Sequence, residues 1–190
     1  MSDLLFSLDD LVLRRPADED AADALALCTD PDVALWNAVP DVVDLGTALA
    51  WCRRGADWSD GRHATWHAAD GITGRLLANC SLYAIDLDDR TARIGYRVAP
   101  WARGRGVARV VVDAVTRWGF TDLGLARVTL EHTVANEASC RVALAAGYRL
   151  EGVLRSSYVD GNGLRHDDHV HGRLVTDEYP DLGHHPVLLL

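Results

Sequence analysis

The segment Pro100–Ala108, Pro-Trp-Ala-Arg-Gly-Arg-Gly-Val-Ala, has the composition of a loop that binds an anion. Gly104 and Gly106 let the backbone approach a ligand closely, and the first amides of a following helix have no partner within the helix. These amides and the helix dipole favour negative charge, and Arg103 and Arg105 add positive charge. The segment therefore predicts a phosphate or pyrophosphate site, with a plain strand-to-helix connection as the alternative.

Two familiar phosphate-binding motifs do not fit this segment. A P-loop needs Gly-Lys followed by Ser or Thr, and the chain contains no lysine. The dinucleotide-binding fingerprint fails because Arg109 stands at its third glycine position. A third pattern, Arg-x-x-Gly-x-Ala, is matched by Arg103, Gly106 and Ala108, and it resembles the acyl-CoA pyrophosphate loop of the GNAT superfamily of N-acetyltransferases.

Blocks on either side of the loop occur in an order that resembles the RimJ/RimL-like branch of this superfamily. The resemblance is dense over residues 92–174 and weaker over residues 10–91. It implies an acetyl-CoA-dependent N-acetyltransferase. The blocks are Ile94-Gly-Tyr96, Asn136-x-x-Ser139, Ala146-Gly-Tyr148, Glu151-Gly-x-x-Arg155, and a last strand that carries Asp167.

The resemblance also implies where the cofactor would lie. The pantetheine arm would enter a gap between strands 92–99 and 127–134, and a backbone N–H near Val98 would polarise the thioester carbonyl. Arg141 could reach the 3′-phosphate of CoA, or it could be an ordinary exposed helix residue. The implied cofactor contacts are Val98, Arg103, Gly104, Arg105, Gly106, Val107, Ala108, Asn136 and Arg141.

Ser139 is the predicted donor of a proton to the leaving thiolate. Many relatives carry a Tyr in this helix, four residues before the glycine of the later block, and this chain has Ala143 there. Ser139 lies one helical turn after Asn136, close to where the thioester would sit. The alternative is a hydroxyl that serves only at the helix start.

Glu131 is the predicted general base. Many relatives place a Glu directly before the Ile-Gly-Tyr block, where this chain has Arg93, so one carboxylate is missing. Glu131 stands five residues before Asn136, where related aminoglycoside acetyltransferases place a carboxylate. It could instead be a solvated strand residue, because water can accept the proton of an α-amine whose pKa is about 7.7–8.0.

The hydrophobic pattern predicts one α/β domain. Its sheet is mixed and mostly antiparallel, with one splayed parallel pair and helices on both faces, as in the GNAT fold. In helix 107–123, Asp113 and Arg117 are predicted to point away from the buried face. We assign the domain to residues 1–180 and a tail to 181–190. The predicted strands are 11–15, two within 63–85, 92–99, 127–134, 148–155 and 166–174, and the helices are 17–28, 44–54, 107–123 and one from Asn136 to Gly147.

Composition excludes several other classes of protein. The 190 residues carry a net charge of −9, which argues against nucleic-acid binding and suits a cationic amine. No apolar run could span a bilayer and no secretory signal is evident, so we expect a cytoplasmic protein without membrane contact. Four cysteines lack metal-ligand spacing, so we predict reduced thiols and no metal. The cysteines are Cys28, Cys52, Cys80 and Cys140, and three scattered histidines, His132, His169 and His171, are predicted to be structural.

The acceptor remains open at this point. The leading candidate is the α-amine of a protein N-terminus, as in ribosomal-protein acetyltransferases. The alternatives are a small-molecule amine, such as an antibiotic of the aminoglycoside type, and an acetyl-CoA sensor without catalysis. Trp36, Trp51 and Trp58 could line one wall of the acceptor site or belong to the core, and the resemblance is compatible with a homodimer.

Overall fold

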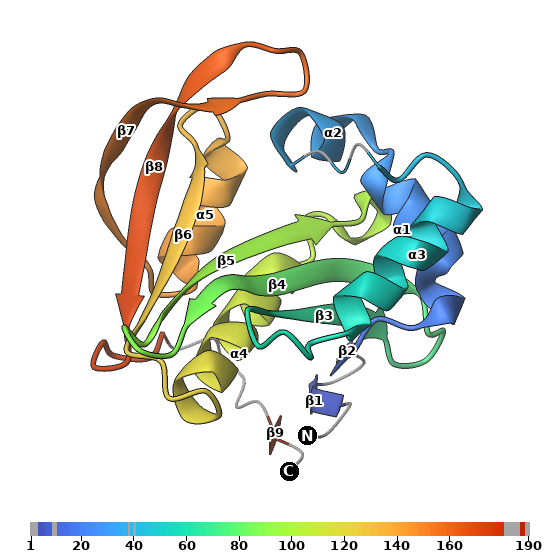
Figure 1. Ribbon diagram of the computed structural model, residues 1–190, viewed down its shortest axis with the longest axis horizontal. Coiled ribbons are helices and arrows are strands. Elements are labelled where there is room, and N and C mark those ends of the chain that lie inside the picture. The colour runs from blue at the N-terminus through green and yellow to red at the C-terminus, as the bar shows by residue number, and fades with distance from the viewer. Residues whose placement is uncertain (1–3, 9–10, 38, 40, 181–186, 189–190) are drawn as a thin grey trace.

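Nine strands form one sheet in the order β7-β8-β6-β5-β4-β3-β2-β1-β9 in the computed structural model, which describes residues 4–8, 11–37, 39, 41–180 and 187–188 (Figure 1). Neighbouring strands are antiparallel except β5 and β6, as predicted. The strands are β1 (Leu4–Leu8), β2 (Leu11–Arg14), β3 (His63–Asp70), β4 (Leu76–Asp86), β5 (Thr91–Val98), β6 (Arg127–Thr133), β7 (Arg149–Val159), β8 (Arg165–Leu174) and β9 (Val187–Leu188).

Helices cover both faces of the sheet (Figure 1). Helix α4 packs on β4 and β5 and contacts α5, whereas α1 and α3 pack together and α3 contacts β3. No helix of the described ranges has the length and apolar composition needed to cross a membrane. The helices are α1 (Ala21–Cys28), α2 (Pro31–Asn37), α3 (Leu45–Ala56), α4 (Val107–Thr121) and α5 (Glu137–Ala145), with the 3-10 turns η1 (Asp18–Asp20) and η2 (Pro100–Ala102).

Strands β5 and β6 are paired along only about half of their length and then diverge. Their parallel pairing ends at Ile94 and Leu130. Beyond that point β5 stays paired with β4 as far as Val98, and β6 stays paired with β8 as far as Thr133. Figure 1 shows the two strands diverging toward α2 and α5. The splayed pair expected from the sequence is therefore present.

Helix α2 is not among the predicted helices, because Asp30-Pro31 resembles a break in the pattern after helix 17–28. Proline is favoured at the first position of a helix, where its missing N–H costs no hydrogen bond. The Asp30 carboxylate accepts a hydrogen bond from the Val33 amide at 3.2 Å. The break in the sequence pattern is thus the start of a short helix.

Asp113 of α4 is buried, so the prediction that it points away from the core is wrong. Arg173 of β8, also fully buried, donates to the Asp113 carboxylate at 2.6 Å and to the carbonyl of Ala146 at 2.9 Å. Arg117 donates to the other carboxylate oxygen at 2.6 Å. Two cations thus compensate one buried anion, an arrangement that the periodicity of α4 alone does not reveal.

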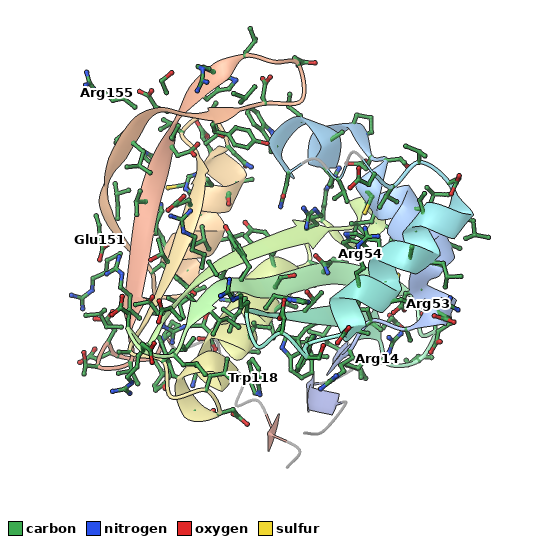
Figure 2. All side chains as sticks on the ribbon, viewed as in Figure 1. Arg14, Arg53, Arg54, Trp118, Glu151 and Arg155 are labelled. Carbon is green, nitrogen blue, oxygen red and sulfur yellow. The ribbon has the colours of Figure 1, made fainter. Side chains whose placement is uncertain are left out.

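A second buried carboxylate, Asp20, fastens η1 to β2 and β3. Arg14 donates to it at 2.8 and 2.6 Å, and Nδ1 of His67 lies 2.8 Å from it. Burial alone would raise the pKa of Asp20, but the hydrogen bonds from His67 and Arg14 hold it well below its usual range. A further pair, Arg53 of α3 with Asp18 of η1, is exposed. Figure 2 labels Arg14 and Arg53.

The first and last described strands, β1 and β9, lie side by side at one edge of the sheet. Val187 and Leu188 pair with Ser7 and Phe6 of β1, so part of the expected tail forms β9. Neither β1 nor β9 was predicted. Most of the tail lies outside the described residues, and the division into a 1–180 domain and a 181–190 tail stays a prediction.

We expect Arg173→Met to destabilise the protein by about 3 kcal/mol, because it leaves a buried carboxylate with one of its two cations. Urea unfolding measures this loss. The matched control is Arg53→Met, which removes a guanidinium from an exposed pair and should leave the midpoint almost unchanged. Equal effects of the two substitutions would show that Asp113 does not depend on Arg173.

Candidate active site

Two cavities meet where β5 and β6 diverge. The first, about 570 Å³, lies between α2, the end of β5, the loop before α4, and α5. The second, about 530 Å³, lies over β3 to β6 and β8. Both cavities open onto the same point of the fold. They share Trp36, Asn37, Tyr96, Arg97, Asn136 and Ser139 as lining residues.

The first cavity brings together most of the residues predicted to bind a cofactor. Arg105 is the one predicted contact that is not among its lining residues. Arg141 lines the cavity but is otherwise exposed and lies 3.7 Å from Glu137. The predicted residues that do line it are Val98, Arg103, Gly104, Gly106, Val107, Ala108, Asn136 and Arg141.

The loop before α4 depends on its two glycines for its backbone conformation. Gly104 and Gly106 have φ values of 73° and 76°, a region that side chains with a Cβ rarely adopt. Val110 donates to the Gly106 carbonyl at 3.4 Å, so the amides of residues 107–109 precede the first bond of the helix. Gly106 is the N-cap, and no side chain caps this end. The predicted anion-binding geometry is present in the backbone.

Arg103 does not offer an unpaired charge to this cavity. Its guanidinium donates to the carboxylate of Asp32 at 2.9 Å and also to Asp30. These contacts fasten the loop to the start of α2. The attraction for an anion at this loop therefore rests more on the backbone amides than the sequence suggested.

Tyr96 and Ser139 form a hydrogen-bonded pair where the two cavities meet. Their hydroxyl oxygens are 3.0 Å apart, and Ser139 is 7% exposed. Asn136 is the N-cap of α5, as predicted, because its side-chain oxygen accepts from the Ser139 amide at 3.1 Å. Burial raises the pKa of Tyr96 to about 12 and outweighs the opposite effect of the hydrogen bond with Ser139, so the phenol stays protonated.

Tyr96 was missed as a site residue, although the sequence contained a signal. Alternation in β5 placed Tyr96 on the same face as Ile94 and Val98, which is the buried face. A buried phenol needs a hydrogen-bond partner for its hydroxyl. That requirement alone marks Tyr96 as a residue whose partner should be sought.

Three polar side chains line the second cavity from one face of the β6–β8 pair. Glu131 and Thr133 alternate on β6, and Asp168 stands opposite Thr133 in the register. Asp168 is buried and accepts from the Thr133 hydroxyl at 3.2 Å. Glu131 accepts from Arg93 at 3.4 Å. The cavity thus presents two carboxylates to a cationic ligand.

The two neighbouring aspartates of β8, Asp167 and Asp168, lie in different environments. Asp167 accepts a hydrogen bond from the Ser156 amide at 2.7 Å and does not line either cavity. Its neighbour Asp168 points to the opposite face and lines the second cavity. A shift of one residue along a strand reverses the face, so only Asp168 of this pair lines a cavity.

Helix α2 and the β7–β8 hairpin lie over the junction of the cavities. The Asn37 amide group donates to the Tyr96 carbonyl at 3.0 Å, and Arg97 donates back to the Asn37 side chain at 2.8 Å. The hairpin reaches α2 through the Gly161 amide, which donates to the Leu35 carbonyl at 3.1 Å. This hydrogen-bonded connection holds the hairpin and β5 on either side of one short helix.

The three tryptophans proposed for the acceptor wall have different environments. Trp36 of α2 lines both cavities and packs its ring edge-on against His166, with centroids 5.8 Å apart. Trp51 packs against His67, away from the junction. Trp58 belongs to the core, beside Trp66 and Trp118. Only Trp36 of these three lines the two cavities.

Three of the four cysteines are buried thiols, as predicted. They are Cys28, Cys52 and Cys80, whereas Cys140 is half-buried on α5. Burial raises the pKa of Cys28 to about 11 and that of Cys52 to about 12. Thiols with such pKa values stay protonated and unreactive at neutral pH.

A family model described as an acetyltransferase (GNAT) domain matches residues 10–149. The chain belongs to the GNAT family of N-acetyltransferases. The uncharacterized N-acetyltransferase YoaA of Bacillus subtilis (strain 168) is 29% identical over 168 residues, which are 88% of this chain and 94% of YoaA. The family and the fold predicted from the sequence are therefore confirmed.

Two solved structures show the same fold at low identity. The ribosomal-protein-S5-alanine acetyltransferase of Vibrio fischeri has a TM-score of 0.82 and 18% identity, over 94% of this chain and all of that one. The microcin C7 self-immunity acetyltransferase MccE, solved with acetyl-CoA and AMP, has a TM-score of 0.78 and 20% identity, over 88% of this chain and 94% of that one. Both likenesses concern the fold, which these two proteins share with the chain.

Proposed function

We propose that this GNAT enzyme moves the acetyl group of acetyl-CoA to the α-amine of a protein N-terminus, by direct attack in a ternary complex. The observation that carries the proposal is the meeting of two cavities at Tyr96 and Ser139. One cavity ends in an anion-binding loop and the other contains carboxylates. A thioester and an amine that entered from opposite sides would meet at this pair of hydroxyls.

Acetyl-CoA would occupy the first cavity. Its pyrophosphate would rest on the amides of residues 103–108, and its pantetheine arm would run along the edge of β5 that β6 leaves unpaired. The backbone near Val98 would polarise the thioester carbonyl. Arg141 and Asn136 would contact the cofactor from α5. MccE, which has the same fold, was solved with acetyl-CoA, and this supports the choice of acetyl-CoA as the donor.

The chemistry needs one proton removed and one delivered. The amine nitrogen attacks the thioester carbon, the carbon–sulfur bond breaks, and the thiolate takes a proton from the Ser139 hydroxyl. Tyr96, held protonated by burial, donates a hydrogen bond to the Ser139 oxygen as charge develops there. Glu131, or water that it orients, accepts the proton of the amine, and water returns a proton to the Ser139 oxygen.

The acceptor would bind in the second cavity as a cation. Glu131 and Asp168 supply negative charge, and Arg97 bounds the cavity on the β5 side. An N-terminal α-amine is deprotonated to an appreciable extent near neutral pH, since its pKa is about 7.7–8.0. The likeness to a ribosomal-protein alanine acetyltransferase supports a protein acceptor.

A small-molecule amine is the second candidate. It is favoured by the coverage of the second cavity, because α2 and the β7–β8 hairpin meet above it and limit its size to about 530 Å³. An acetyl-CoA sensor without catalysis is the remaining alternative. A cytoplasmic location, a homodimer and the absence of nucleic-acid partners stay predictions.

Gly106→Asp should abolish acetyl-CoA binding, because it adds a negative charge and an unfavourable φ where the pyrophosphate would lie. The matched control is Gly74→Asp, since Gly74 has a φ of 72° and no atom within 4 Å of an added Cβ, but lies outside both cavities. Isothermal calorimetry measures the affinities. Unchanged affinity in Gly106→Asp would remove the loop from the proposed site.

Ser139→Ala should lower kcat by about 100-fold or less, because water can partly replace one general acid, and should leave acetyl-CoA affinity within a few-fold. Tyr96→Phe keeps the ring and should lower kcat less. Steady-state kinetics of both variants with saturating acetyl-CoA measures the effects. An unchanged kcat in Ser139→Ala across the pH range would reduce Ser139 to a hydroxyl at the helix start.

Acceptor class is tested with acetyl-CoA, thiol detection and three amines. These are a peptide with a free N-terminus, the same peptide blocked at its N-terminus but containing lysine, and an aminoglycoside. We expect the free peptide to have the highest kcat/KM. A preference for the aminoglycoside would select the second candidate, and binding of acetyl-CoA without turnover of any amine would select the sensor.

Glu131→Gln refines the same assay. It keeps the shape of the side chain and removes its charge, so the acidic limb of kcat/KM should lose a step while the basic limb changes least. Peptides whose α-amines differ in pKa provide the control. An acidic limb that follows the amine pKa equally in the wild type and in Glu131→Gln would show that the proton leaves through water.

A further inference from the structure

Three histidines and one cysteine come together between β6, β8 and α5. His132 comes from β6, His169 and His171 from β8, and Cys140 from α5. One nitrogen or sulfur atom of each side chain lies within 4.8 Å of those of the other three. His132 and His171 are buried, and the other two are half-buried. No step of the proposed acetyl transfer uses these four side chains as a group.

The register of the sheet explains why the histidines share a face. His132 pairs directly with His169 across β6 and β8, and His171 follows two residues later on the same face. Helix α5 packs against β6 and brings Cys140 to the cluster. The carboxylates of the second cavity, on Glu131 and Asp168, alternate with the histidines and lie on the opposite face of the strand pair.

The ring nitrogens are oriented as in a metal site. The Nδ1 atom of His132 lies 2.9 Å from the Thr133 carbonyl oxygen and can only donate to it, so its Nε2 carries the lone pair. That Nε2 lies 3.1 Å from the Nε2 of His171. Ligand nitrogens about 2.0–2.1 Å from a tetrahedral Zn²⁺ are separated by roughly 3.3 Å. The pair therefore needs only a small adjustment to bind one ion.

Two ring nitrogens of the cluster lack a hydrogen-bond partner among the described residues. The Nδ1 atoms of His169 and His171 are buried without a hydrogen-bond partner. Two adjoining imidazoles can share only one hydrogen bond, whereas one cation can accept a lone pair from each.

We propose that His132, Cys140, His169 and His171 bind one Zn²⁺. Three imidazoles and a thiolate form a borderline-soft, four-coordinate set of the kind that zinc prefers. All four positions are filled by protein, so the ion serves structure and not catalysis. The ion would join α5 to β6 and β8 through Cys140, which follows Ser139 in the sequence. The site stands independently of the acetyl transfer proposed above.

The test uses untagged protein in which His184 and His185 are both replaced by Ala, since this adjacent pair could bind metals on its own. Zinc content is measured by mass spectrometry after dialysis, and Co²⁺ is then added to metal-free protein. We expect one zinc per chain and, with cobalt, tetrahedral d–d bands and a thiolate-to-cobalt charge-transfer band. Zn²⁺ should displace the cobalt and raise the Tm.

Variants assign the ligands. Cys140→Ser should remove the charge-transfer band and His169→Gln should weaken Zn²⁺ binding by at least about 10-fold. Cys28→Ser and His63→Gln are the matched controls, since neither residue belongs to the cluster, and both should bind as the parent does. The half-buried position of His169 keeps the test valid should Cys140→Ser fail to fold.

The proposal is overturned by either of two results. Parent protein that retains no zinc and gives only the spectrum of hexa-aqua cobalt would show that the histidines form a buried cluster without an ion. A cobalt spectrum that is the same in the parent, in Cys140→Ser and in His169→Gln would place the ion elsewhere.

Discussion

The divergence of β5 from β6 beyond Ile94 and Leu130 is the constraint on which the rest of this structure depends. Separating two strands exposes a row of backbone donors and acceptors, and buried groups of this kind must find other partners. On its other side, β6 remains hydrogen-bonded to β8 as far as Thr133. Among the described strands β5 has no such neighbour on that side, and its edge is a surface along which a linear ligand could lie.

Helix α2 supplies hydrogen-bond partners on the β5 side of the gap between the two strands. Asn37 satisfies the Tyr96 carbonyl, Arg97 holds Asn37, and Arg103 fastens the loop before α4 to Asp30 and Asp32. One seven-residue helix is therefore bonded both to the strand edge and to the loop. The same helix lines both cavities through Trp36 and Asn37. It therefore connects the loop before α4 with the second cavity.

The sequence predicted what local pattern controls and missed what distant partners control. Alternation and helical spacing placed the strands from β2 to β8 and the helices α1, α3, α4 and α5 to within a few residues. Asn136 was identified as a cap because capping depends only on residues three positions apart. By contrast, the burial of Asp113 depends on Arg173, sixty positions away, and no local pattern reports such a partner.

The site shows the same division. The loop before α4 depends on glycines and a helix start within one segment, so its backbone conformation could be predicted from the sequence. The Tyr96–Ser139 pair joins β5 to α5, and the histidine cluster joins three elements, so each needed the register of the sheet before it could be seen. Ligand spacing along the chain was a poor guide to the cluster, because its members are brought together by strand pairing and helix packing.

The first turn of α5 connects these two features. Ser139 and Cys140 are consecutive residues, about 100° apart around a helix with 3.6 residues per turn. One therefore faces β5 and Tyr96 while the other faces the histidines of β6 and β8. Because β5 and β6 have separated at this level, no ladder of backbone hydrogen bonds sets the distance between the two sides. That distance is set instead by the packing of α5 against both strands, so any contact that fixes Cys140 to β6 and β8 also fixes how far the Ser139 hydroxyl reaches into the gap.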